Sequence, residues 1–250
     1  MPSVSALSPR IQGRLSHLRV YRSACYSRLA RRHLLYAQGT TIIKKMLIAA
    51  SAALATLVPT AASAQSVAPG QSKADYLAWL AQKPENPGQV RSFRAFLTEQ
   101  RVQDVVPIWQ LVRTSSSWQQ CSADPFEVAP ATQWGNIVQT LGFVKSEVMP
   151  AIGKVEALSG FRNDDLNRCS NGKPGSAHRM FFAMDLVPVE GIARGDMISR
   201  LCSAHGRKGP EYRTGLGFYS GSRFHVDSNG FRKWGSDGRG ATSPCNRGYA

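Results

Sequence analysis

Residues 176–185 read Ser-Ala-His-Arg-Met-Phe-Phe-Ala-Met-Asp, and this stretch decides the expected fold and chemistry. It contains His178, one of only 5 histidines in the chain, and Asp185, with an apolar run between them. A carboxylate buried among apolar side chains is costly unless it is paired or binds a metal. Asp185 therefore needs either a cationic partner, for which Arg179 and Arg223 are candidates, or a metal ion.

A later segment repeats the combination of histidine and aspartate. Residues 224–227 read Phe-His-Val-Asp, so His225 and Asp227 share one face of an extended segment. Two histidines and one carboxylate form a ligand set that leaves zinc a fourth, open position for water. The pattern predicts a Zn2+ site made by His178, Asp185 and His225. Taken singly, either histidine would more often be a hydrogen-bonded structural residue.

Residues 1–64 are expected to be an N-terminal extension and signal peptide. Residues 46–64 are small and apolar, follow a Lys-Lys pair and end in Ala-Ser-Ala, a small-x-small cleavage pattern. A transmembrane anchor is disfavoured because the apolar core is short and broken by Pro59. A mitochondrial transit peptide is disfavoured by the cleavage site. We expect an exported protein, periplasmic or in the cell envelope, with no membrane span after cleavage.

The net charge is concentrated in this leader. The chain has 31 Lys and Arg against 16 Asp and Glu, a formal net charge of +15. Nine of the basic residues precede residue 46, which leaves 22 against 16 in the remainder. The high charge is therefore no argument for a nucleic-acid partner. The part after residue 64 is long enough for one domain with a hydrophobic core, and we expect a monomer.

Four cysteines remain after the leader, which contains Cys25. An even number of cysteines in an exported chain predicts two disulfides, and three pairings are open. A zinc site made of cysteines is disfavoured because their spacing is wide and no Cys-x-x-Cys pair occurs. The four are Cys121, Cys169, Cys202 and Cys245.

Helical periodicity comes first along the chain and short strands come later. Residues 65–103 are expected to form a helical segment, with one helix capped by Ser72 and Asp75 and a second running to about residue 101. In residues 104–250 we expect an extended stretch at 105–113, the longest helix at 132–152, strands at 154–158 and 182–189, a helix at 192–205 and a hairpin at 214–219 and 222–227. This order predicts an α+β fold, with N-terminal helices packed on a small, mainly antiparallel sheet that carries the zinc site.

Several of these residues resemble a known pattern: Ser159-Gly160-Phe161-Arg162, Ser176-x-His178, Ala183-x-Asp185, and Arg223 to Asp227 followed by Arg232 and Trp234. Together they are similar to the M15 family of zinc D-Ala-D-Ala peptidases, and closest to its murein endopeptidases and carboxypeptidases. The likeness implies that residues 104–250 form a zinc domain like that of the M15 peptidases of subfamily A, with a Hedgehog/DD-peptidase-like fold. It implies Zn2+ on His178, Asp185 and His225 and cleavage next to D-amino acids in peptidoglycan stem peptides. It also gives Arg162 the catalytic part of binding or polarising the substrate.

The chain departs from this pattern at two positions. Phe181 replaces a glycine, which would narrow the pocket or shift the loop, and Ser222 replaces a carboxylate that serves as general base in many members. Asp227 is the nearest substitute, either as the catalytic base or as a residue that holds another group in place. These departures favour a rival hypothesis, a non-catalytic cell-wall-binding or interaction domain. A zinc amidase or peptidase acting on other short peptides is a third.

Other polar and aromatic residues have simpler interpretations. Arg162 could brace the loop beside two following aspartates instead of binding substrate. His205 is expected to contact the C-terminal end of a helix. Arg232 and Trp234 are expected to stack on each other as a structural closure. Trp118 and Tyr219 could line a groove, although aromatic side chains are usually part of the core; these residues are all in the printed sequence.

Overall fold

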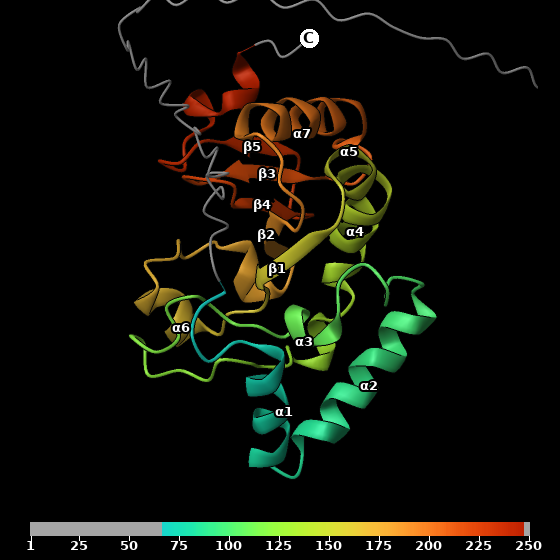
Figure 1. The fold of residues 1–250 in the computed structure, drawn as a ribbon, viewed down its shortest axis with the longest axis vertical. Coiled ribbons are helices and arrows are strands. Elements are labelled where there is room, and N and C mark those ends of the chain that lie inside the picture. Colours follow the sequence, from blue (N-terminus) through green and yellow to red (C-terminus); the bar gives the residue numbers. More distant parts are fainter. Residues whose placement is uncertain (1–66, 248–250) are drawn as a thin grey trace, which may run out of the picture. The chain divides into compact units, whose positions relative to one another are not determined.

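Strand β2 (Ala183–Pro188) is an inner strand of a five-stranded sheet with the order β1-β2-β4-β3-β5. Its neighbours β1 (Val155–Ser159) and β4 (Phe224–Asp227) pair with it antiparallel, and β4 pairs antiparallel with β3 (Gly215–Phe218). Strand β5 (Arg232–Trp234) closes the edge, parallel to β3. The mixed helix and sheet architecture and the mainly antiparallel sheet confirm the predicted α+β class (Figure 1).

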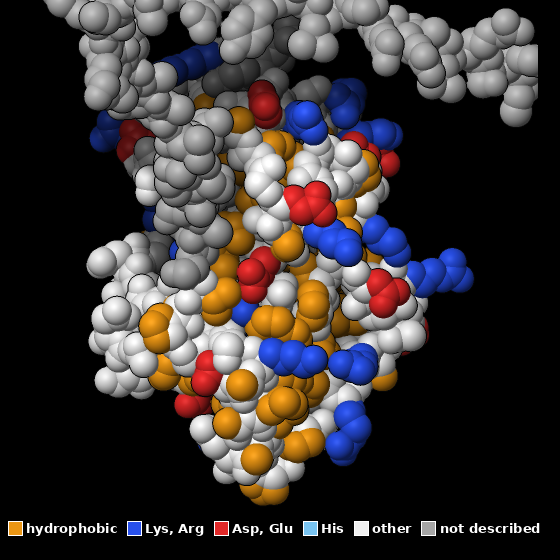
Figure 2. Space-filling model, in the orientation of Figure 1, with side chains coloured by type: hydrophobic (Ala, Val, Ile, Leu, Met, Phe, Trp, Pro, Cys, Tyr) orange, Lys and Arg blue, Asp and Glu red, His pale blue; other side chains and the backbone are white. Residues whose placement is uncertain are grey.

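The computed structural model describes residues 67–247, within a unit that spans Leu57–Ala250. The expected signal peptide and Cys25 lie outside the described residues. Within residues 67–247, no helix is long and apolar enough to cross a membrane. Figure 2 shows both basic and acidic side chains distributed over the face in view.

The N-terminal helices form where the sequence supplies caps. Helix α1 (Lys73–Gln82) begins with a capping box, in which the Ser72 hydroxyl accepts from the Asp75 amide and the Asp75 carboxylate accepts from the Ser72 amide. Helix α2 (Asn86–Glu99) follows almost at once. The proline at its second position suits the first helical turn, where a backbone N–H would have no partner within the helix.

The middle of the chain differs from expectation in two places. Residues 105–113 are not extended: helix α3 (Ile108–Leu111) begins directly after Pro107, whose fixed φ suits a helix start. The long helix expected at 132–152 is present but divided, with a 3-10 turn (Ala131–Gln133), α4 (Asn136–Phe143), a π-helical turn (Val144–Val148) and α5 (Met149–Ile152). The π turn precedes Pro150, which has no N–H to continue the α-helical ladder.

The remaining helices bracket the later strands. Helix α6 (Asp164–Cys169) and the 3-10 helix Ala177–Met180 lie between β1 and β2 in the chain. Helix α7 (Arg194–Lys208) lies between β2 and β3, and two further 3-10 turns, Gly240–Thr242 and Pro244–Asn246, follow β5.

Alternation along the strands divides the sheet into a core face and a second face that carries polar groups. Alternate residues of β2, β4 and β3 belong to the hydrophobic core, together with buried residues of α2, α4 and α7. The intervening residues point to the opposite face. The core set is Met184, Leu186, Phe224, Val226, Leu216 and Phe218; the opposite set is Asp185, His225, Asp227, Gly215 and Gly217. All of these residues are buried.

Phe181 is held in a left-handed backbone conformation, with φ of 56°, directly before β2. This conformation costs a non-glycine residue about 1–2 kcal/mol. The aromatic ring is buried, and ring centroids of Phe93 and Phe161 lie 5.7 Å and 6.3 Å away. Aromatic packing therefore offsets the backbone strain, and the ring belongs to the core.

The structure pairs the cysteines in the order of the chain, Cys121 with Cys169 and Cys202 with Cys245. Their Cα atoms are 5.7 Å and 5.2 Å apart. The first disulfide joins the loop before α4 to the end of α6, and the second joins α7 to the C-terminal tail. Of the three pairings left open by the sequence, this is the one that the fold supports.

Candidate metal centre

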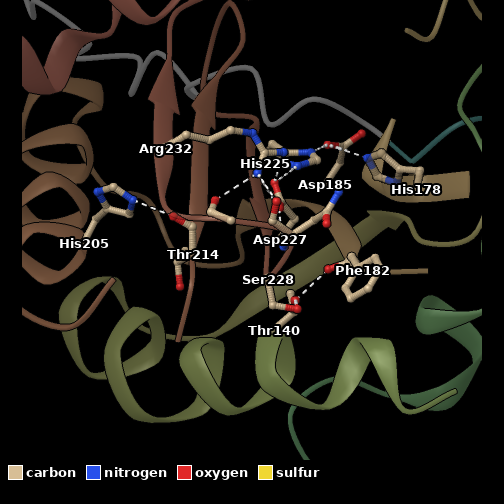
Figure 3. Close-up of polar contacts among 12 residues, drawn as sticks. Thr140, His178, Phe182, Asp185, His205, Thr214, His225, Asp227, Ser228 and Arg232 are labelled. Atoms are coloured by element: carbon tan, nitrogen blue, oxygen red, sulfur yellow. Dashed lines mark hydrogen bonds and ion pairs between the residues drawn. The ribbon is translucent and has the colours of Figure 1, made fainter. Parts of the chain in front are cut away.

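His178, Asp185 and His225 converge on one point. Each offers one ligand atom, and these atoms all lie within 4.8 Å of one another. Asp185 and His225 are directly opposite in the β2–β4 register, and His178 is delivered by the 3-10 helix before β2. The two imidazoles lie on either side of the Asp185 carboxylate (Figure 3). The structure therefore brings together the three residues named from the sequence, in a buried group that could hold a metal ion.

Hydrogen bonds on the far side of each ring fix which nitrogen faces the cluster. Nδ1 of His178 lies 2.6 Å from the carbonyl oxygen of Gly160, which can only accept, so Nδ1 carries a proton and Nε2 faces Asp185 at 3.3 Å. Nε2 of His225 lies 2.8 Å from a carboxylate oxygen of Asp227, and Nδ1 faces Asp185 at 3.1 Å. When each ring is neutral and protonated on this outer nitrogen, the remaining lone pairs are directed into the same space beside Asp185, where an ion could be shared.

The second oxygen of Asp185 has two cationic partners. Arg162 donates to it at 2.5 Å and Arg223 at 2.6 Å. The hydroxyl of Tyr219 donates to the first oxygen at 3.0 Å. The alternative that Arg162 braces the loop beside Asp164 or Asp165 is not what the structure shows, because these two pair with Arg179 at 2.7 Å and with Arg168 at 3.1 Å. Asp185 thus has cationic partners and also faces both imidazoles.

Burial and these contacts shift the pKa of each group. Burial lowers the pKa of His178 to about 4, with a further contribution from Arg162. Burial also opposes the charged form of His225, but hydrogen bonds to Asp185 and Asp227 outweigh it and raise its pKa. For Asp185, burial favours the neutral acid, yet His178 and the two arginines hold its pKa well below the usual value. Burial raises the pKa of Tyr219, so its hydroxyl stays a donor at neutral pH.

Asp227 lies behind His225, on the side away from Asp185. One of its oxygens accepts from the Asn229 amide at 2.8 Å and from Arg232 at 2.9 Å. The other accepts from His225 and from Arg232, both at 2.8 Å. Both oxygens are thus engaged, and the carboxylate is fully buried. Of the two roles expected for Asp227, this geometry favours holding His225 in place over acting as a base.

Two glycines on β3 make room for these contacts. A Cβ added at Gly215 would overlap Asp227 and Arg232, and one at Gly217 would overlap the indole of Trp234. The Trp234 ring lies with its centroid 5.3 Å from the His225 ring and 5.3 Å from the Tyr219 ring. The expectation that Arg232 and Trp234 stack on each other is not what the structure shows: Arg232 pairs with Asp227, and Trp234 packs on the ring of His225.

The sequence indicated Arg223 as a possible partner of Asp185, which the structure shows, but it did not indicate Tyr219 as a member of this site. Arg223 precedes His225 by two residues on the same strand face, a signal that was available. Tyr219 follows β3 and reaches the site through the hairpin, where its amide donates to the Arg223 carbonyl at 3.2 Å. That placement depends on strand pairing, which the pattern of one segment does not reveal.

Two other residues lie outside the group. Nε2 of His205, on α7, lies 2.9 Å from the carbonyl oxygen of Thr214 (Figure 3). The His205 ring also stacks on Phe231, so this histidine contributes to packing outside the cluster. Trp118 donates from its indole nitrogen to the carbonyl of Pro69 at 2.9 Å and packs on the N-terminal segment.

The donor set fits a borderline-soft divalent ion. Two imidazole nitrogens and one carboxylate oxygen are ligands that zinc prefers, and three protein ligands leave a position for water or substrate. Comparison of the chain with protein-family models, with curated proteins and with solved structures finds no match.

Proposed function

We propose that the protein is a zinc-dependent hydrolase that cleaves peptide bonds next to D-amino acids in peptidoglycan, as in the M15 peptidases that it resembles. One observation carries the proposal: the two imidazoles face one carboxylate oxygen in a buried group, and each ring is held from behind by Gly160 or Asp227. Such supporting contacts are what ligating histidines need. The two disulfides fit the proposed export, because disulfides persist in oxidising compartments.

A bound zinc ion would lower the pKa of its water and polarise the scissile carbonyl. The chain adds hydrogen-bond donors beside the cluster. Arg162 is fixed by a hydrogen bond from Nε to the Ser159 hydroxyl at 2.9 Å, and its Nη2 lies 3.4 Å from Nε2 of His178. The Tyr219 hydroxyl is a second, neutral donor. We assign Arg162 to the stabilisation of negative charge on the substrate oxygen as water attacks, while Tyr219, whose one proton is donated to Asp185, helps to hold that carboxylate.

Asp227 serves in this proposal as a positioning residue. Arg232 binds it with two hydrogen bonds, which keeps it ionised and accepting from His225. Its loss would free the ring to turn and to change the nitrogen that carries the proton.

The backbone at Phe181 supports the likeness to the M15 pattern. The pattern has glycine at this position, and the φ of 56° lies in the region that glycine adopts without cost. The chain keeps the backbone turn after the first ligand although it lacks the glycine. The ring is directed into the core, so the departure leaves the pocket unchanged in this proposal.

A second function is favoured by a specific observation. In the described part of the chain, the carboxylates that contact the two site histidines are Asp185 and Asp227, and each oxygen of both is engaged. Ser222 stands where many M15 enzymes have a base. A non-catalytic protein that binds wall peptides on the same scaffold is therefore the rival.

Metal analysis tests the site. Purified protein should hold close to one zinc ion per chain, and His178→Ala, Asp185→Asn and His225→Ala should each lose most of it. His205→Gln is the matched control, since this histidine is also buried but lies outside the cluster. Full zinc in the three site variants would end the assignment.

Digestion of purified peptidoglycan separates the enzyme from the binder. Mass spectrometry of the soluble fraction should show peptides cut next to D-alanine, and a chelator should abolish them. A binder would retain wall fragments and release no products. Comparison of D-Ala-D-Ala with L-Ala-L-Ala peptides then tests the stereochemical preference.

A further inference from the structure

Arg223 has a hydrogen-bond donor that the described residues leave without an acceptor. Its Nη2 donates to Asp185 at 2.6 Å and its Nη1 to the Ser116 hydroxyl at 3.2 Å. Its Nε is buried and has no partner within residues 67–247. An unsatisfied donor on a cationic group is costly, more so than on a neutral one. This position therefore favours an acceptor supplied by a ligand.

The charges around the site also favour an anionic ligand. Arg162 and Arg223 both donate to one oxygen of Asp185, whose single negative charge is shared between them. The other buried carboxylate, Asp227, is already paired with Arg232. The group thus has one more positive charge than its carboxylates neutralise, and a divalent ion would increase the excess. Such an excess of positive charge attracts anions.

Of the two arginines on Asp185, Arg223 is the one with a buried donor left without an acceptor among the described residues. The Nε of Arg162 is occupied by Ser159 and its Nη2 by Asp185. The side chain of Arg223 is 19% exposed and that of Arg162 is 10% exposed, so Arg223 is the more accessible. An arginine fork matches the geometry of a carboxylate with two parallel hydrogen bonds.

We propose that Arg223 binds the free terminal carboxylate of a peptide and so makes the site select peptides that end one residue beyond the cleaved bond. The guanidinium lies against Asp185, and consecutive residues of a peptide are about 3.8 Å apart, so a carboxylate bound there is next to a carbonyl held at the cluster. This inference rests on the proposed function, and it places the protein among carboxypeptidases. Ser116, from the loop stapled by the Cys121–Cys169 disulfide, holds the guanidinium in place.

The test uses two probes, acetyl-Lys-D-Ala-D-Ala with a free carboxylate and the same peptide with a C-terminal carboxamide. Zinc-loaded wild type, Arg223→Gln, Arg223→Lys and the control Arg91→Gln, an exposed arginine of α2, are compared. Hydrolysis gives kcat and KM, and calorimetry gives the binding of each peptide. Zinc content and melting temperature are measured for every variant.

Wild type and the Arg91→Gln control should prefer the carboxylate peptide by about 10- to 100-fold, the range of a charge-assisted hydrogen-bond pair. Arg223→Gln should lose this preference through KM and through binding, so that the ratio between the two peptides falls towards one. Arg223→Lys, which keeps the charge and loses the fork, should be intermediate. If Arg223→Gln loses its zinc, only Arg223→Lys is used to test the inference. A carboxylate-to-carboxamide preference in Arg223→Lys equal to that of wild type then overturns the inference.

The same data separate this inference from the proposed function. An equal preference ratio in wild type and Arg223→Gln overturns the role of Arg223 while leaving hydrolysis intact. Binding that prefers the carboxylate, with no turnover of either peptide, overturns the hydrolase and supports Arg223 as the anchor in the wall-binding rival. A wild type that binds both peptides equally overturns the inference whether or not it cleaves them.

Discussion

The indole of Trp234 occupies the space that a side chain at Gly217 would fill, so β3 and β5 meet through a glycine and a tryptophan. The same indole packs on the ring of His225. Gly217→Ala should therefore displace Trp234 and destabilise the protein by about 1–3 kcal/mol, the usual cost of overpacking. Urea denaturation should show the loss, and tryptophan fluorescence should show the displaced ring.

Gly195→Ala on α7 is the control, because nothing lies within 4 Å of a Cβ added there. It should be neutral or stabilising by up to about 1 kcal/mol, since alanine is the better helix former. In the double variant Gly217→Ala/Trp234→Ala the alanine no longer has an indole to displace. Its cost should be smaller than the sum of the two single costs, and strict additivity would show that the two residues do not compete for space.

Asp227→Asn should weaken zinc binding by about 10- to 100-fold, the usual effect of losing a partner of a ligating histidine. An asparagine oxygen can still accept from His225, but its amide cannot accept from Arg232, so the ring is held less firmly. Arg232→Gln should act in the same direction and more weakly. Competition with a chromophoric chelator measures both. If Asp227 is the catalytic base instead, Asp227→Asn will lose kcat while its zinc affinity stays unchanged.

In the ion-free protein the two site histidines should make stability greatest near pH 6.5. Burial lowers the pKa of His178 to about 4, so its contribution is complete above the unfolded value of 6.5 and is lost as the pH falls towards 4. The pKa of His225 is raised by Asp185 and Asp227 against the effect of burial, so its contribution is complete below 6.5 and is lost as the pH rises through the folded value.

Urea denaturation of chelator-treated protein across the pH range measures this profile. His225→Gln should flatten the alkaline side. His178→Gln should reduce the loss of stability at acid pH without removing it. Burial also lowers the pKa of His205, so His205 contributes to the same loss. A profile that keeps its alkaline decline in His225→Gln would contradict the assignment of that decline to this ring.

Alkylation before reduction should find no free thiol among the four cysteines of the described part, and peptide mapping should give the pairs 121–169 and 202–245. Replacing either pair by alanines should lower the free energy of unfolding by about 2–4 kcal/mol. The variant without the Cys121–Cys169 disulfide should also bind carboxylate peptides more weakly. That disulfide fixes the loop in which the Ser116 hydroxyl accepts a hydrogen bond from Arg223. The Cys202–Cys245 variant should leave that binding unchanged at temperatures where it is folded.

The candidate ligand set could be named from the sequence because its chemistry is local. His178 and Asp185 are near each other in the chain, and the alternation around His225 placed Asp227 on its face. The contacts that fix each ring could not be named in the same way. Gly160 reaches His178 through its backbone carbonyl, which any residue has, and Tyr219 reaches Asp185 only once β3 pairs with β4.

Errors in the expected elements have similar causes. The apolar residues at 105–113 suggested an extended stretch, but a short helix begins there directly after Pro107. Strand β5 lies in a glycine-rich tail with a weak pattern, and its pairing with β3 depends on Gly215 and Gly217 making room for the side chains of Arg232 and Trp234. The secondary structure of both segments depends on how they fit the rest of the fold, and a short window of sequence contains too little information about that fit.

The disulfides follow one another along the chain without crossing, so 48 residues separate the first pair and 43 the second. A chain that enters an oxidising compartment N-terminus first presents Cys121 and Cys169 before either later cysteine arrives. With Cys25 removed in the proposed leader, an oxidase that joins thiols in order of arrival produces the native bridges directly. Maturation along this route requires an oxidant but no isomerase to reshuffle mispaired bonds.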